Sequence, residues 1–85
     1  MVEEKVIIRN EEGLHARTAA LFLQKSVKFQ SEITLNKDGY SYDGKSILSI
    51  LSMAAFKGDE IVITCSGEDE EEALKALVDF IENDI

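Results

Sequence analysis

The sequence has little cysteine and histidine and no proline, and each absence excludes a class of structure. Cys65 is the only cysteine among the 85 residues, so the chain cannot form an internal disulfide. Together with His15, the only histidine, it cannot supply the four ligands of a structural zinc site, and we expect no metal and no cofactor. Because proline and low-complexity linkers are also absent, we expect one small domain, residues 1–85.

Long apolar runs and an excess of positive charge are missing as well. No run approaches the roughly 18 residues that span a bilayer, and the N-terminus lacks the basic start and apolar core of a signal peptide. We therefore expect a soluble cytoplasmic protein with no membrane insertion. The chain carries 9 Lys and Arg against 17 Asp and Glu, a net charge of −8. A chain this acidic repels a phosphate backbone, which disfavours nucleic acid as a partner.

The spacing of apolar residues switches between the strand and helix periods along the chain. Alternation predicts strands near residues 3–9, 32–36, 40–42 and 61–66. Helical spacing predicts helices at 16–27, within the apolar stretch 47–56, and over a last stripe that runs from Ala73 to Ile81. The order is β-α-β-β-α-β-α, and the strands have mainly one apolar face. This pattern predicts an α+β domain with an antiparallel sheet, helices on one face, and the first and last strands paired.

Local signals refine these boundaries. Asp38-Gly39 between two alternating runs predicts a hairpin with a type I′ turn. Gly58 is expected to adopt a left-handed conformation after the second helix. Asp69, with Glu72 three residues later, is typical of a capping box at the start of the last helix. Cys65 continues the apolar face of the fourth strand, so we expect it to be buried.

His15 stands at the expected start of the first helix. The first N–H groups of a helix lack partners, and together with the helix dipole they form an anion site. The same positive end disfavours the imidazolium form and leaves a neutral, nucleophilic nitrogen. Arg17 adds a guanidinium suited to phosphate oxygens. A nucleophile, a cation and free N–H donors are what reversible phosphoryl transfer requires. The alternative is that this lone histidine before a helix is only a capping or surface residue.

Two segments resemble one known family. The segment Gly13–Arg17, GLHAR, resembles the active-site segment of HPr, the histidine-containing phosphocarrier of the phosphoenolpyruvate:sugar phosphotransferase system. The segment Lys45–Leu48, KSIL, resembles the regulatory-serine segment of the same family. Lys57-Gly58 and Ser66-Gly67 fit as well, and the resemblance extends over essentially the entire chain.

The resemblance implies an open-faced β-sandwich of four antiparallel strands and three helices. It implies a carrier rather than a classical enzyme: enzyme I phosphorylates His15 on Nδ1, and the phosphoryl group passes to a sugar-specific enzyme IIA. Arg17 and the N–H groups of Ala16 and Arg17 would stabilise the phosphate, with Thr18 beside them. Ser46 would be phosphorylated by a separate serine kinase, and a phosphorylase would remove the phosphoryl group. That form is a poor substrate for enzyme I and acts with a regulator in carbon catabolite control.

A short surface helix needs only one apolar stripe for packing, and four apolar residues are not required for that stripe. They are expected to form a docking surface for partners and are Ala20, Ile47, Leu48 and Leu51. The alternative is that each of them belongs to the core, a role expected of Ile50, Met53 and Ala54. Ser46 likewise has a purely structural interpretation as the N-cap of the second helix.

The chain departs from the family pattern at several positions. Thr18 replaces the usual proline. We expect the first helix to form nevertheless, and the loop before it to be less rigid. Glu12 replaces a small polar residue. If its carboxylate lies about 6 Å from the phosphoryl group, repulsion amounts to about 0.7–3 kcal/mol per charge, making His15 a poorer acceptor and its phosphorylated form a more energetic donor. Ser49 and Leu51 replace glycine and methionine, and Ala54 replaces a further glycine.

The sequence leaves two other functions open. The first is a regulator of the same fold that acts mainly by docking, with Ser46 as its switch. The second is a hydrolase or metal enzyme, which the sequence disfavours because one histidine and one cysteine offer no triad or ligand set. We expect the protein to be a monomer.

Overall fold

The computed structural model describes residues Met1–Ile85, and its elements follow the expected order. The strands are β1 (Val2–Ile7), β2 (Glu32–Lys37), β3 (Tyr40–Asp43) and β4 (Glu60–Ser66). The helices are α1 (Ala16–Ser26), α2 (Ile47–Ser52) and α3 (Glu70–Asp79), and α3 continues into the π-helical turn η1 (Phe80–Asp84). No helix is both long enough and apolar enough to cross a membrane.

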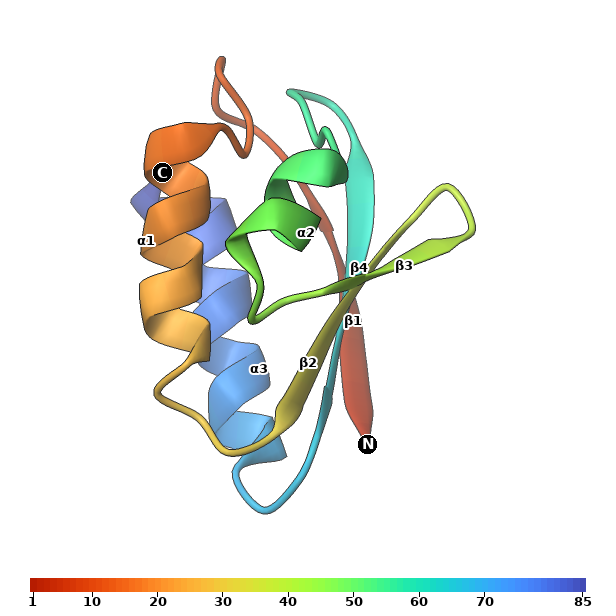
Figure 1. Ribbon diagram of the computed structural model, residues 1–85, viewed down its shortest axis with the longest axis vertical. Helices are drawn as coiled ribbons and strands as arrows, with labels where there is room; N and C mark the ends of the chain where they lie inside the picture. Colours follow the sequence, from red (N-terminus) through yellow and green to blue (C-terminus); the bar gives the residue numbers. More distant parts are fainter.

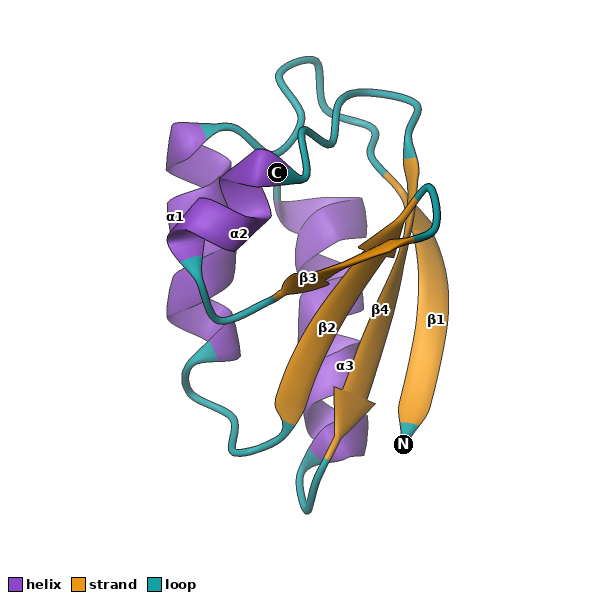
Figure 2. Ribbon diagram, turned by 45° about the vertical axis from the view of Figure 1, so that its right-hand side comes forward, coloured by secondary structure: helices purple, strands orange, loops and turns teal.

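The strands form one antiparallel sheet in the order β1-β4-β2-β3. Val6 pairs with Ile61 between β1 and β4, and Leu35 pairs with Ile63 between β2 and β4. All three helices lie on one side of the sheet, and the other side is left open (Figures 1 and 2). The expected α+β fold, including the pairing of the first and last strands, is confirmed.

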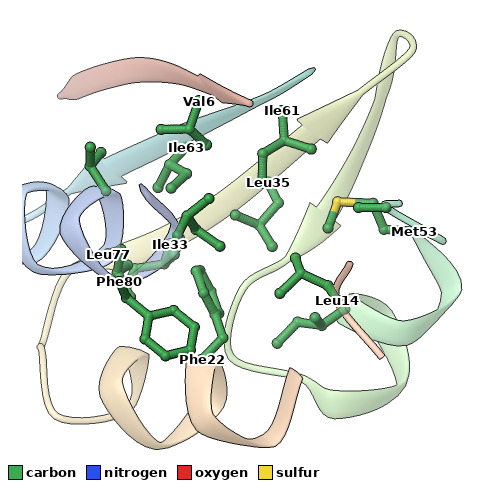
Figure 3. Close-up of a cluster of buried hydrophobic side chains, with 14 of the residues drawn as sticks. Val6, Leu14, Phe22, Ile33, Leu35, Met53, Ile61, Ile63, Leu77 and Phe80 are labelled. Carbon is green, nitrogen blue, oxygen red and sulfur yellow. The ribbon is translucent and has the colours of Figure 1, made fainter. Parts of the chain in front are cut away.

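The core lies between the helices and the covered face of the sheet (Figure 3). Alternate strand residues are fully buried there, and Phe22 of α1 meets Phe80 edge-on at 6.2 Å between ring centroids. Cys65 is buried as expected. Burial raises the pKa of its thiol, and the charges of Asp69 and Glu70 raise it further. The thiol is therefore protonated and unreactive at neutral pH.

Two local expectations are confirmed by the backbone. Asp38 and Gly39 have φ of 54° and 85°, as the two central residues of a type I′ turn require. Gly58 has a φ of 93° in the turn that leads into β4.

The second helix is shorter than expected. It ends at Ser52 because Ala54 adopts a left-handed φ of 52°, and this turn places the Ala55 carbonyl where it accepts a 2.9 Å hydrogen bond from the Leu14 N–H. Met53 and Ile50 are buried as expected, but Ala54 is exposed, so its assignment to the core was wrong.

Asp69 is the N-cap residue of α3, but its side chain makes no capping hydrogen bond, so the expected capping box with Glu72 was wrong. Its carboxylate instead accepts hydrogen bonds from the Gln30 and Ser31 N–H groups, at 2.9 and 3.0 Å, and from the Ser31 hydroxyl at 2.5 Å. These bonds hold the turn before β2 against the start of α3. They also lower the pKa of Asp69, with the Ser31 hydroxyl bond as the largest cause.

The lowered pKa of Asp69 predicts a dependence of stability on acid. A carboxyl group whose pKa falls on folding stabilises the fold above its ordinary value of about 4, and that contribution is lost as the pH falls through the folded-state pKa. Asp69→Asn should therefore be less stable than wild type at neutral pH, and the gap should narrow as the pH falls below about 4. Urea unfolding across that range measures both free energies. Glu72→Gln, at an exposed position without a partner, should have the same free energy of unfolding as wild type across this pH range. If the difference between Asp69→Asn and wild type does not change with pH, the Asp69 carboxylate is not the source of this pH dependence.

Candidate functional site

The loop from Ile8 to His15 is held against the turn between α2 and β4. Leu14 is buried, and its N–H donates to the Ala55 carbonyl. Ile8 donates to Asp59 at 2.9 Å and accepts from Gly58 at 2.8 Å. These hydrogen bonds fix the chain immediately before α1, so the position of His15 is set by residues from two distant parts of the sequence.

His15 is the N-cap residue of α1, with an extended φ of −102° and ψ of −168°. The first helical hydrogen bond runs from the Ala19 N–H to the His15 carbonyl at 2.7 Å. The N–H groups of Ala16, Arg17 and Thr18 therefore precede the helical ladder. The imidazole thus lies beside the donors and the positive dipole end that favour a bound anion.

Thr18 stabilises this loop through its side chain. The residue is fully buried, and its hydroxyl accepts from the His15 N–H at 3.1 Å and donates to the Gly13 carbonyl at 2.7 Å. These two bonds offset the expected loss of rigidity where proline is replaced. Because the hydroxyl is engaged inside the loop, Thr18 can offer a phosphate only its backbone N–H, which faces the His15 side chain in a capping-box arrangement.

Arg17 and Ala16 are both exposed on the first turn of α1. The Arg17 guanidinium forms no hydrogen bond or ion pair with any other residue of the chain. A free guanidinium two residues from the histidine is available to a phosphate that approaches from solvent.

Glu12 lies against the ring itself. Its Oε1 is 3.1 Å from His15 Nε2, and the carboxylate is largely exposed. Nε2 is shielded from solvent and makes no hydrogen bond that meets the usual geometry, so the Glu12 carboxylate is the polar group in contact with it. The sequence-based hypothesis considered only the distance from Glu12 to a phosphoryl group and missed the contact with the far ring nitrogen.

The site is an open surface. The protein has two shallow hollows, one between β1 and α3 and the other at the acidic residues 67–72, and neither includes His15. The His15 side chain is 34% exposed outside both hollows, so a group presented by another protein can reach it, whereas a small-molecule substrate normally needs a concave site.

The four expected docking residues lie on α1 and α2, which pack together. Leu48 has 77% of its surface exposed and Leu51 37%, and Ala20 is also exposed. Ile47 is half-buried and packs against the core, so it serves both roles. Phe56, 60% exposed, was missed because the sequence placed it inside the second helix. Its Cα lies next to Gly13, so it adds an exposed aromatic ring beside the His15 loop.

Ser46 is the N-cap of α2, as expected. Its hydroxyl oxygen accepts from the Ser49 N–H at 3.3 Å. Ser49 in turn accepts from the Asp43 N–H at 2.8 Å, which ties the first turn of α2 to the end of β3. The serine that replaces glycine at position 49 therefore has a structural role next to Ser46.

Comparison with known proteins decides the family. The family model described as the phosphotransferase-system HPr component phosphorylation site matches residues 2–83. This chain belongs to the HPr family. HPr proteins are phosphocarriers rather than catalytic enzymes, which agrees with a histidine on an open surface.

Several HPr relatives cover nearly the whole chain. The HPr-like protein Crh of Bacillus subtilis is 41% identical over 85 residues, covering both chains completely. Phosphocarrier protein HPr of Xylella fastidiosa is 41% identical over 83 residues, 98% of this chain and 93% of its own. The crystal structure of HPr-C-His from Thermoanaerobacter tengcongensis superimposes with a TM-score of 0.94 at 48% identity, covering 96% of this chain and 92% of its own. The family therefore includes both phosphocarriers and the HPr-like protein Crh.

Proposed function

We propose that this protein accepts a phosphoryl group on His15 from phosphorylated enzyme I and passes it to a sugar-specific enzyme IIA. The observation that carries the proposal is the position of His15: it is the N-cap of α1, with an unpaired Arg17 and N–H groups that precede the helical ladder. Transfer between two proteins needs a nucleophile on an accessible surface, and phosphoryl transfer depends mostly on positioning and charge stabilisation.

Each residue of the site has a distinct role in this mechanism. The lone pair of His15 Nδ1 attacks phosphorus, because Nε2 is shielded and in contact with Glu12. The phosphoryl oxygens then accept hydrogen bonds from the Ala16 and Arg17 N–H groups, and the Thr18 N–H extends this set. The Arg17 guanidinium compensates their charge as the phosphoryl group arrives and leaves. Thr18 holds the loop geometry through its hydroxyl.

Docking to both partners is assigned to the exposed apolar residues around the site. Leu48→Ser should weaken binding of enzyme I about tenfold, because truncating a central apolar contact typically costs more than about 1 kcal/mol. Folding should be unaffected, since Leu48 is 77% exposed. Isothermal titration measures the affinity. The matched control is Tyr40→Ser, which is 69% exposed on the β2–β3 hairpin that points away from the helices (Figure 1). Equal affinities for the two variants would contradict this docking surface.

A docking regulator is the second candidate function. It is favoured by the similarity to Crh, a Bacillus subtilis protein described as a catabolite repression protein, and by Ser46 at the N-terminus of the exposed α2. A phosphate on Ser46 would add about two negative charges beside Leu48 and so alter docking. A serine kinase and phosphorylase and a catabolite-control regulator would then be further partners.

The two functions differ in the residue that they require. The carrier predicts that phosphoryl groups from phosphoenolpyruvate reach enzyme IIA with Ser46→Ala and not with His15→Ala. If His15→Ala retains full biological function and Ser46→Ala loses it, the regulator is correct.

The monomeric state and the cytoplasmic location belong to the same proposal. A small acidic carrier that visits two partners in turn functions as a monomer in the cytoplasm. The solved Crh structure with a TM-score of 0.80 and 41% identity, covering all of this chain and 98% of its own, is described as a dimer with a swapped domain. Light scattering after size exclusion distinguishes these states for this chain.

A further inference from the structure

We propose that Glu12 is a positioning residue that keeps the proton of neutral His15 on Nε2 and thereby presents Nδ1 as the nucleophile. The proposal rests on the phosphocarrier function for its consequence, but the position of the proton is a property of the free protein. It starts from the 3.1 Å contact between Glu12 Oε1 and His15 Nε2 and from the shielding of that nitrogen from solvent.

The local backbone directs Glu12 toward the ring. Asn10 and Gly13 close a turn through two hydrogen bonds, from the Gly13 N–H to the Asn10 carbonyl at 3.2 Å and from the Asn10 side-chain amide to the Gly13 carbonyl at 3.0 Å. Glu11 and Glu12 occupy the centre of this turn. Glu11 pairs with Lys57 at 2.6 Å, which lowers the pKa of its carboxyl group, whereas Glu12 has no lysine or arginine partner. Two adjacent glutamates therefore have separate partners, and His15 is the partner of the second.

The contact selects one tautomer of the imidazole. A neutral imidazole carries its proton on one nitrogen and a lone pair on the other. An N–H on Nε2 is attracted to the carboxylate oxygen, whereas a lone pair there would face a negative charge at 3.1 Å with no solvent donor to relieve it. The contact is not aligned as a hydrogen bond, but the Nε2–H tautomer is still favoured, because the preference is electrostatic. The Nε2–H tautomer leaves the lone pair on Nδ1, next to the N-terminus of α1.

The same carboxylate compensates charge during transfer. As Nδ1 bonds to phosphorus, the bond from phosphorus to the donor atom of phosphorylated enzyme I breaks, and its electron pair leaves with that donor atom. Nε2 retains its proton throughout, so the phosphorylated ring is an imidazolium with a carboxylate at its far nitrogen. This arrangement parallels the carboxylate that orients a catalytic histidine and stabilises its imidazolium form. It also reverses the effect expected from repulsion alone: Glu12 should make His15 a better acceptor.

Nuclear magnetic resonance of the unphosphorylated protein tests the tautomer directly. With ¹⁵N-labelled histidine at about pH 9, where an ordinary imidazole is neutral, the two ring nitrogens report the proton position. We expect wild-type His15 to be almost wholly Nε2–H, and Glu12→Gln to raise the Nδ1–H fraction several-fold, because a glutamine amide can face either form. The matched control is Glu11→Gln, which removes the same charge one residue away and should leave the tautomers unchanged. An unchanged tautomer ratio in Glu12→Gln would overturn the proposal.

A second arm tests the direction of the effect on transfer. At equilibrium with phosphorylated enzyme I, the proposal predicts a several-fold lower phosphorylated fraction for Glu12→Gln than for Glu11→Gln. A higher fraction would mean that repulsion of the phosphoryl group dominates, and would overturn the charge compensation. If wild type itself accepts no phosphoryl group, the proposed carrier function fails, and the tautomer measurement still decides the role of Glu12.

Discussion

Replacing Arg17 by alanine should slow phosphoryl transfer through His15 by about 100-fold, a loss typical for removing one donor that stabilises transition-state charge. Arg17 is exposed and has no partner elsewhere in the chain, so its guanidinium is free to contact the phosphoryl oxygens. For the same reason its loss should change the free energy of unfolding by no more than about 0.5 kcal/mol. Rapid-quench transfer from phosphorylated enzyme I gives the rate, and urea unfolding gives the stability.

Two further substitutions distinguish a specific role from a general loss of charge. Lys28→Ala removes the same charge just beyond the opposite end of α1 and should transfer at nearly the wild-type rate. Arg17→Lys keeps the charge without the planar fork and should fall between wild type and Arg17→Ala. Equal rates for Arg17→Ala and Lys28→Ala would show that Arg17 does not contact the transferring group.

Gly13→Ala should lower the free energy of unfolding by about 3 kcal/mol, the sum of strain at a positive φ and a steric clash. Gly13 has a φ of 66°, and a Cβ atom there would clash with the Ala55 carbonyl oxygen and lie 2.8 Å from the Phe56 Cα. Both are backbone atoms that side-chain rotation cannot move. The loop must shift to accommodate the methyl group, and the shift also displaces His15, so transfer should slow in the folded fraction.

Gly39→Ala is the matched control for the steric part. Gly39 has a φ of 85°, but no atom lies within 4 Å of the position of its Cβ. Only the conformational cost of a positive φ remains, so Gly39→Ala should lower the free energy of unfolding by about 1 kcal/mol. Thermal or urea unfolding measures both variants. If Gly13→Ala is no less stable than Gly39→Ala, the close approach of the His15 loop to the α2–β4 turn is not a stabilising feature.

The parts of this fold that follow from local physics were predictable from sequence. Asp38-Gly39 forms its turn because two adjacent residues there tolerate positive φ, and Ser46 caps α2 through a neighbouring N–H. His15 lies at the start of α1 because the apolar stripe of the helix begins just after it. Each of these features depends on residues a few positions apart, which a single sequence displays directly.

The parts that were missed depend on residues distant in sequence. Asp69 resembles a capping residue locally, but its carboxylate bonds residues 30 and 31 once α3 packs beside them. The end of α2 at Ser52 is coupled to a hydrogen bond with Leu14, which exposes Phe56 next to the site. The spacing of Glu12 and His15 was visible, but the direction of the Glu12 side chain depends on a turn closed by Asn10.

The central claim is that His15 carries a phosphoryl group, and intact-mass measurement tests it most directly. The purified protein is incubated with bacterial enzyme I, Mg²⁺ and phosphoenolpyruvate, and its mass is taken before and after brief acid treatment. The account predicts one phosphoryl group that is lost in acid, as a phosphoramidate should be, and that never forms on His15→Ala. No added phosphoryl group on wild type, or one that survives acid and still appears on His15→Ala, would contradict it.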